Sequence, residues 1–360
     1  MNQDSSPPDP TSNVIDYPAR DLTITIRAEM LYGELQSVLA TESQQLPIDS
    51  GSDSLSIADM IYRDLCGPRE YSFGTLRDYV IGIEATDGQG RVFHGGGRVV
   101  KNVAGYDLCR LMVGSEGKLG RLNSVTLKVI PNSPSGCLVL CEFDDSNSLE
   151  AALLRLNTSQ TTPAILDIAS SNLIATVLSS TSATNYKVSA DSSQRLHLIV
   201  GFCGPEDVCD WQTKTVQLEL SGCVQPPVVI NSNSTFQHWC KAACTLAGHS
   251  VQEDNPDWLV EIRTLPSLSA DMAFRLQAAG CVIYGHIGNG RLWAGPSANA
   301  IASNTAELQS VIQLARSMIA ESHGYVRVLR GEFATLMDPP PDVQALISKL
   351  TDVLGTHTDG

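Results

Sequence analysis

The sequence lacks the features that mark membrane-spanning, iron–sulfur and nucleic-acid-binding proteins. No apolar run approaches the roughly 18 residues that a helix needs to cross a bilayer. Ten cysteines are present, but no CxxC pair occurs, which argues against a ferredoxin-like cluster motif. Basic residues are also scarce. The 24 Lys and Arg face 39 Asp and Glu, and the net charge of -15 disfavours binding to nucleic acid or anionic lipid.

The first 20 residues contain neither the basic region nor the apolar region of a secretory signal. They are polar and rich in proline, so we expect a disordered tail over residues 1–20. We also expect a cytoplasmic protein. In that reducing compartment the cysteines would serve mainly as small buried hydrophobic residues.

Two different patterns of apolar and polar residues follow the tail and predict two domains. Residues 22–28 alternate apolar and polar side chains as a half-buried strand does, and an amphipathic helix follows. We assign residues 21–131 to a first domain. In residues 132–335, short apolar strands alternate with amphipathic helices, which predicts an α+β sandwich with helices on one face of an antiparallel sheet. Residues 336–360 are expected to form a C-terminal helix and tail.

Glycine is concentrated in the first domain, where 12 of the 28 glycines lie between Gly67 and Gly120. Asp107 suits the first turn of a short helix, and Gly114 suits the end of that helix. Gly114, Gly117 and Gly120 leave the following loop almost free of side chains, so its backbone N–H groups could approach a flat ring or a phosphate. The same glycines would also serve as ordinary turns and helix caps.

Two strings in this region are specific enough to indicate a family. They are FGTLRDYVIG at 73–82 and KNVAGYDLCRLMVGSEGKLG at 101–120. Together they resemble the PCMH-type flavoproteins, also called the vanillyl-alcohol-oxidase family. Within that family they are most similar to the FAD-binding subunit of bacterial glycolate oxidase. Weaker similarity extends through most of the chain.

The resemblance implies an α+β protein with a PCMH-type FAD-binding domain followed by a cap domain. The activity implied is oxidation of a 2-hydroxy acid by hydride transfer to FAD, in a complex with a second flavin subunit and an iron–sulfur subunit. It indicates no catalytic residue and no metal. The residues that it places against the cofactor are Ser56, Gly67, Lys101, Asn102, Gly105, Asp107, Gly114, Ser115, Gly117 and Gly120.

The sequence departs from the family pattern in ways that keep a second interpretation open. The strand at 22–28 aligns with the start of the second FAD-binding subdomain, so only that subdomain is expected. Ala58 and Asp59 stand where relatives carry two glycines close to the pyrophosphate, and a carboxylate there would oppose binding. The alternative is a non-catalytic subunit that kept the fold and lost FAD. An absent subdomain would also expose Leu22, Ile24 and Ile26 and favour self-association.

Three weaker signals are interpreted as structural. GHIGNG at 285–290 is flanked by strands, so a hairpin loop is favoured over a dinucleotide-binding turn. In HWCKAAC at 238–244, the histidine does not share a helix face with the two cysteines, and core packing is favoured over a metal site. His286 and His323 are the two histidines considered as bases, although structural roles are favoured for both.

Overall fold

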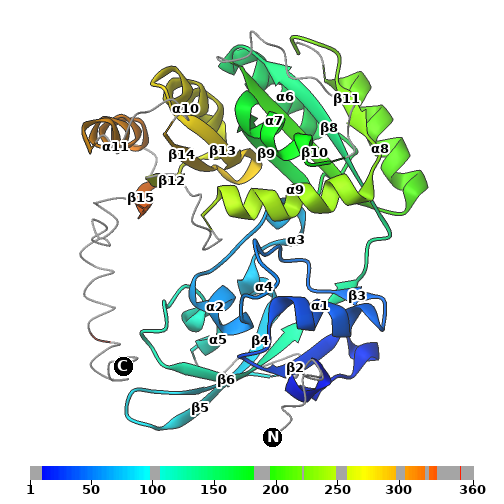
Figure 1. Cartoon of the computed structure of the whole chain (residues 1–360), viewed down its shortest axis with the longest axis vertical. Helices are drawn as coiled ribbons and strands as arrows, with labels where there is room; N and C mark the ends of the chain where they lie inside the picture. The colour runs from blue at the N-terminus through cyan, green and yellow to red at the C-terminus, as the bar shows by residue number, and fades with distance from the viewer. Residues whose placement is uncertain are drawn as a thin grey trace, which may run out of the picture. The chain divides into compact units, whose positions relative to one another are not determined.

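The computed structural model describes residues 10–97, 106–181, 195–220, 223–248, 258–296, 305–320, 324–330 and 349. The chain divides into two compact units (Figure 1). Unit 1 contains the described residues up to Cys66 and from Gly74 to Asn132, and unit 2 contains Gly67–Phe73 and those from Ser133 onward to residue 330. A short segment from the first half of the sequence therefore belongs to the second unit.

Unit 1 is built on a five-stranded antiparallel sheet with the strand order β1-β2-β6-β4-β5. Its strands are β1 (Val14–Asp16), β2 (Thr23–Arg27), β4 (Val80–Thr86), β5 (Val92–Gly96) and β6 (Arg121–Lys128), and β3 (Gln44–Gln45) pairs separately with β7 (Ile130–Pro131). Its helices are η1 (Pro10–Asn13), η2 (Ala19–Asp21), α1 (Tyr32–Ala40), α2 (Ile57–Tyr62), α4 (Leu76–Tyr79) and α5 (Leu108–Met112).

The expectation of an exposed apolar patch near the start of unit 1 is wrong. The predicted strand at 22–28 is β2, which lies inside the sheet between β1 and β6. Its Ile24 and Ile26 are fully buried, and so is Leu35 on α1. Because these side chains already lie in a core, they give no reason to expect self-association.

The prediction of a disordered tail is also wrong from residue 10 onward. Strand β1 pairs with β2, and Val14 lies opposite Ile26. Polar side chains beside β1 hydrogen bond to the body of unit 1: the Asn13 amide donates to Glu34 at 3.4 Å, and the Tyr17 hydroxyl to Gln44 at 3.1 Å. The polar composition that suggests disorder here supplies hydrogen bonds instead.

Unit 2 contains an eight-stranded antiparallel sheet with the order β11-β8-β10-β9-β13-β14-β12-β15. The strands are β8 (Ser135–Phe143), β9 (Ile165–Ser170), β10 (Leu196–Gly204), β11 (Val228–Ile230), β12 (Leu259–Arg263), β13 (Val282–His286), β14 (Arg291–Gly295) and β15 (Tyr325–Arg330). The helices are α3 (Glu70–Phe73), α6 (Ser146–Thr158), α7 (Ser171–Ser179), α8 (Glu206–Glu219), α9 (Asn233–Leu246), α10 (Pro266–Ala278), η3 (Ile287–Asn289) and α11 (Thr305–Ile319).

Helices cover both faces of this sheet, which corrects the expectation that they lie on one. Alternate residues of β8 enter two different cores. Val139 packs in one core with residues of α6, α8, α10 and α11, whereas Leu138 packs in the other with residues of α7 and α9. A strand covered on both sides reads as a continuous apolar run, as β8 does. The α+β sandwich itself is confirmed.

Two further predictions can be compared with the described residues. GHIGNG is the connection between β13 and β14, so the hairpin interpretation is confirmed. The C-terminal helix and tail at 336–360 lie outside the described residues except for Lys349. Among the described helices, none has the length and apolar character needed to cross a membrane.

Candidate functional site

The glycine-rich loop Gly114–Gly120 in unit 1, here called the glycine loop, is anchored to the end of α2. The N–H of Gly114 donates to the carbonyl of Ile61, and the N–H of Glu116 to the carbonyl of Tyr62, both at 2.9 Å. The Tyr62 hydroxyl accepts from the N–H of Leu122 at 2.6 Å and donates to the carbonyl of Gly120 at 3.3 Å. The backbone of this loop is therefore held in place at both ends.

The glycines of the loop are required for different reasons. Gly120 is structural, because a Cβ at this position would lie 2.6 Å from the carbonyl oxygen of Thr86. Gly117 has a left-handed backbone with φ of +72°, yet no atom of the described residues lies within 4 Å of its would-be Cβ. The space beside Gly117 is thus open to a ligand, in contrast to the space beside Gly120.

Ser115 adds an unused polar atom to the same loop. Its Oγ is buried and has no hydrogen-bond partner among the described residues. Buried hydroxyl groups normally have a partner, so this one calls for an explanation. A phosphate or ring atom bound at the loop would supply it. Ser115 and Gly117 therefore fit the cofactor that the resemblance implies.

Ser56 and Asp59 have a local structural role at the start of α2. The Ser56 Oγ accepts from the N–H of Asp59 at 3.0 Å and donates to the Asp59 carboxylate at 2.7 Å. The N–H groups of Ile57 and Ala58 are also taken, by the carbonyls of Met30 and Ala28. Because the first N–H groups of α2 are already bonded, this turn offers none to a pyrophosphate. It therefore does not fit the contact predicted for Ser56.

Of the remaining predicted cofactor residues, Asp107 has a structural role that the described residues show. Asp107 caps α5 by accepting from the N–H of Arg110 at 3.0 Å, and it also pairs with the Arg110 side chain at 3.3 Å. Gly67 belongs to unit 2. Lys101, Asn102 and Gly105 lie outside the described residues.

A second polar cluster lies inside unit 2, around the fully buried carboxylate of Asp167 on β9. This carboxylate accepts from the Trp239 indole and the Tyr284 hydroxyl, both at 3.0 Å, and from Nδ1 of His286 at 2.7 Å. The pairing of β9 with β13 creates the last contact, because it places His286 opposite Asp167. Sequence reasoning missed Asp167. The available signal was a single carboxylate within the otherwise apolar strand ILDIAS.

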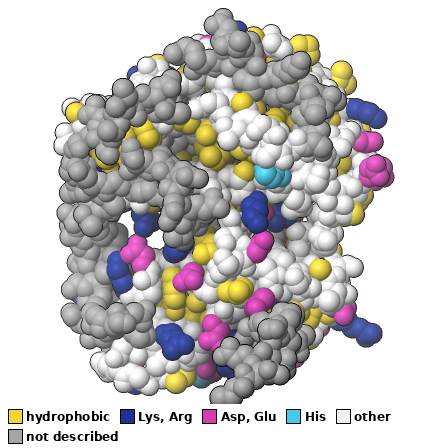
Figure 2. Space-filling model, viewed as in Figure 1, with side chains coloured by type: hydrophobic (Ala, Val, Ile, Leu, Met, Phe, Trp, Pro, Cys, Tyr) yellow, Lys and Arg dark blue, Asp and Glu magenta, His cyan; other side chains and the backbone are white. Residues whose placement is uncertain are grey.

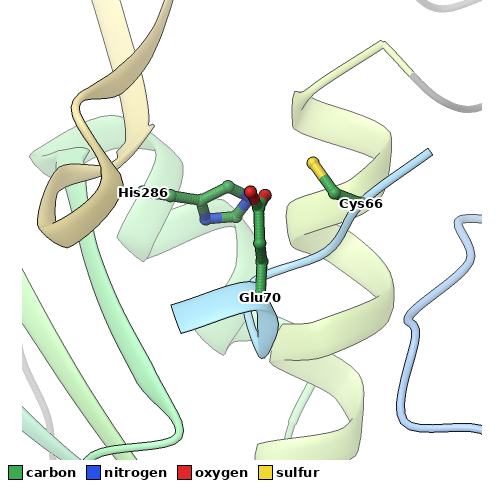
Figure 3. Close-up of side chains that lie close together, drawn as sticks. All are labelled: Cys66, Glu70 and His286. Atoms are coloured by element: carbon green, nitrogen blue, oxygen red, sulfur yellow. The ribbon is translucent and has the colours of Figure 1, made fainter. Parts of the chain in front are cut away.

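The hydrogen bond to Asp167 determines how His286 can act. It holds the Nδ1 hydrogen on the Asp167 side, so Nε2 carries the lone pair. Nε2 is buried and has no hydrogen-bond partner among the described residues. Glu70 of α3 points toward the imidazole ring (Figure 3), and its carboxylate lies within 4.8 Å of a ring nitrogen. His323, the other candidate base, lies outside the described residues.

Buried ion pairs flank this cluster. Arg291 donates from Nε to Glu261 at 2.6 Å and from Nη1 to Glu70 at 3.5 Å. Burial alone would raise the pKa of Glu261, but the charges of Arg291 and Arg263 lower it below its ordinary value. The positive charge of Arg291 is therefore balanced by the carboxylates of Glu261 and Glu70.

The metal interpretation of HWCKAAC gains no support from the geometry. Cys240 is buried in the core formed with α7 and α9, and the ring of His238 contacts the Ser180 hydroxyl at 3.3 Å. On the face seen in Figure 2, described Lys and Arg side chains are interspersed with Asp and Glu.

Comparisons with known proteins agree with the fold and with the resemblance. No family model matches. The chain is 38% identical over 120 residues to glycolate oxidase subunit GlcE of Escherichia coli, covering 33% of this chain and 34% of that one. It is 24% identical over 314 residues to glycolate oxidase subunit GlcD of Bacillus subtilis, covering 84% and 64%. A D-lactate dehydrogenase of Archaeoglobus fulgidus is 36% identical over 85 residues, covering 24% and 19%.

A solved structure of alkyldihydroxyacetonephosphate synthase matches with a TM-score of 0.62 at 14% identity, covering 95% of this chain and 64% of that one. The fold is the PCMH-type flavoprotein fold. The resemblance to glycolate-oxidase-type FAD-binding subunits is confirmed. The matches span less than two thirds of the length of these relatives, from 19% to 64%.

Proposed function

We propose that this chain binds FAD and is a subunit of an oxidoreductase that oxidises a 2-hydroxy acid of the glycolate or D-lactate kind. The observation that carries the proposal is the glycine loop, with open space at Gly117 and an unpartnered buried hydroxyl at Ser115. The relatives named glycolate oxidase and D-lactate dehydrogenase support the substrate class. FAD, when bound, supplies the acceptor for the hydride from C2 of the acid.

For the base that takes the hydroxyl proton, we propose His286. Asp167 orients the ring, and Nε2 remains to accept a proton from a ligand bound to unit 2. Of the other described histidines, His197 contacts a serine hydroxyl, His238 contacts another, and His94 pairs with a carboxylate but is exposed. His286 is thus the buried histidine held by a carboxylate.

The subunit names of two relatives support a complex. We propose that the chain assembles with a second flavin subunit and an iron–sulfur subunit, to which the electrons pass. The scattered cysteines agree with this division of labour, because a cluster needs several thiolates close together. A cytoplasmic location remains a prediction from the composition.

The test of FAD binding compares two glycines with the same backbone strain. Gly117→Val is expected to abolish flavin retention, measured by visible absorbance of the purified protein and by titration with FAD. Gly90→Val is the control, because Gly90 has φ of +79°, open space around it and a place in the β4–β5 turn. Both variants strain the backbone alike, so a difference in flavin content reports on the loop.

Equal flavin content in the two variants would contradict the assignment of the glycine loop. Absence of flavin from the parent protein, purified alone and with co-expressed partner subunits, would contradict FAD binding altogether. That result would favour the alternative of a non-catalytic subunit that retained the fold.

The test of the base uses the flavin-loaded protein and His286→Gln. Glycolate and D-lactate are mixed with it separately, and bleaching of the flavin is followed by stopped flow. We expect unchanged flavin content and bleaching slowed by roughly 100-fold or more. His197→Gln is the matched control, since His197 is equally buried. Equal slowing in both variants would show that His286 is no base.

A further inference from the structure

Two pairs of thiols connect β8 with the neighbouring α8 region of unit 2. Cys137 and Cys141 are four residues apart on β8, so both face the core that contains α8. The thiol of Cys137 contacts the carbonyl of Phe202 at 3.9 Å and interacts electrostatically with the thiol of Cys209 on α8. The thiol of Cys141 interacts electrostatically with that of Cys223, which follows α8.

The backbone holds the second pair together independently of the thiols. The N–H of Val224 donates to the carbonyl of Glu142 at 2.9 Å, so the residues next to both cysteines are joined. A few residues further on, β11 pairs with β8 and places Val228 opposite Leu140. Main-chain contacts of the residues that follow Cys223 therefore hold it near Cys141.

The two members of this pair differ in exposure and in acidity. Cys141 is 1% exposed, whereas Cys223 is only partly buried against the same core. The interaction with Cys141 lowers the pKa of the Cys223 thiol, and the same interaction together with burial raises that of Cys141. The more accessible sulfur is thus also the one that ionises more readily.

We propose that Cys141 and Cys223 form a redox-sensitive dithiol that closes to a disulfide when a hydroperoxide oxidises the protein. The Cys223 thiolate attacks one oxygen of hydrogen peroxide, the O–O bond breaks, and the departing hydroxide takes a proton to become water. The sulfur of Cys141 then attacks the Cys223 sulfenic acid and releases the second water. Two thiols and one peroxide give one disulfide and two waters.

The first pair supplies a control within the same chain. Burial, together with Cys209, raises the pKa of Cys137 to about 12. Burial also raises the pKa of Cys209 and outweighs the interaction with Cys137, which lowers it; the carboxylates of Asp210 and Asp207 act in the same direction as burial. Neither sulfur of this pair favours the thiolate, so the Cys137–Cys209 pair is expected to stay reduced when Cys141 and Cys223 react.

The experiment oxidises the full-length reduced protein with increasing hydrogen peroxide, blocks the remaining thiols by alkylation and maps disulfides by mass spectrometry of non-reduced peptides. We expect the Cys141–Cys223 link to form first and the Cys137–Cys209 link not to form at the same dose. No Cys141–Cys223 disulfide, or equal oxidation of both pairs, would overturn the proposal.

Two variants test the order of events. In Cys141→Ser, the resolving thiol is absent, so a sulfenic acid should accumulate on Cys223 and be trapped by dimedone. Cys223→Ser should show neither trapping at Cys141 nor a disulfide, whereas Cys137→Ser should keep the Cys141–Cys223 link. Trapping on Cys141 in the Cys223→Ser protein would reverse the assigned roles and contradict the proposal. The wild-type measurement stands even where a variant folds poorly.

Discussion

At the scale of the single residue, His197 shows how burial makes stability depend on pH. Burial, with the nearby Arg195 charge, lowers the pKa of His197 to about 4, against 6.5 in an unfolded chain. The unfolded chain binds the extra proton first, so stability is complete above pH 6.5 and falls as the pH drops toward 4. The loss at pH 4 is about 3 kcal/mol.

We therefore expect His197→Gln to be less sensitive to acid than the parent between pH 6.5 and pH 4. The free energy of unfolding, from urea titrations at several pH values, measures this. His94→Gln is the control for replacing a histidine by glutamine, because His94 is exposed where His197 is buried. Parallel pH profiles for the parent and His197→Gln would contradict the neutral, buried state of His197.

At the scale of the element, the start of α2 allows a test of whether Ser56 stabilises the helix or contacts FAD. Ser56→Ala removes the side chain that caps the helix, and we expect it to lower the free energy of unfolding by about 1 kcal/mol. Ser56→Thr should restore most of this, because threonine also accepts the N–H of Asp59. FAD affinity should be the same in all three proteins. A loss of FAD binding in Ser56→Ala alone would return Ser56 to the cofactor site.

The elements also show what could be read from the sequence. The alternation of apolar and polar side chains at 22–28 identified β2. The strands predicted on either side of GHIGNG identified the β13–β14 hairpin. Strand β9 escaped notice because it is buried on both faces, and an apolar run of that length is ambiguous between strand and helix. The Asp167–His286 contact could not be predicted, since it depends on the register of two strands more than 100 residues apart. The glycine loop was predictable from residue type, whereas the occupied N–H groups of α2 were not.

At the scale of the whole molecule, the segment Gly67–Phe73 departs from the simple order of one domain after another. It lies in the first third of the sequence but belongs to unit 2. Glu70 pairs there with Arg291, and Tyr71 packs against the core that contains α6, α8, α10 and α11. The boundary near residue 131 was placed where the composition of the sequence changes. Composition carries no information on contacts between distant segments, so it could not assign Gly67–Phe73 to unit 2.

The contact between Tyr71 and Gly288 allows this attachment to be measured. A Cβ on Gly288 would lie 2.4 Å from the Tyr71 ring, so Gly288→Ala should be destabilising in the parent protein. In a Tyr71→Ala background the ring is gone, and the same change should cost much less. We expect a coupling free energy of about 1–2 kcal/mol from the double-mutant cycle, measured by urea unfolding of the full chain. Gly280→Ala, with open space around it, is the control and should show no coupling to Tyr71. Additive effects of Gly288→Ala and Tyr71→Ala would mean that the segment is not held against η3 in solution.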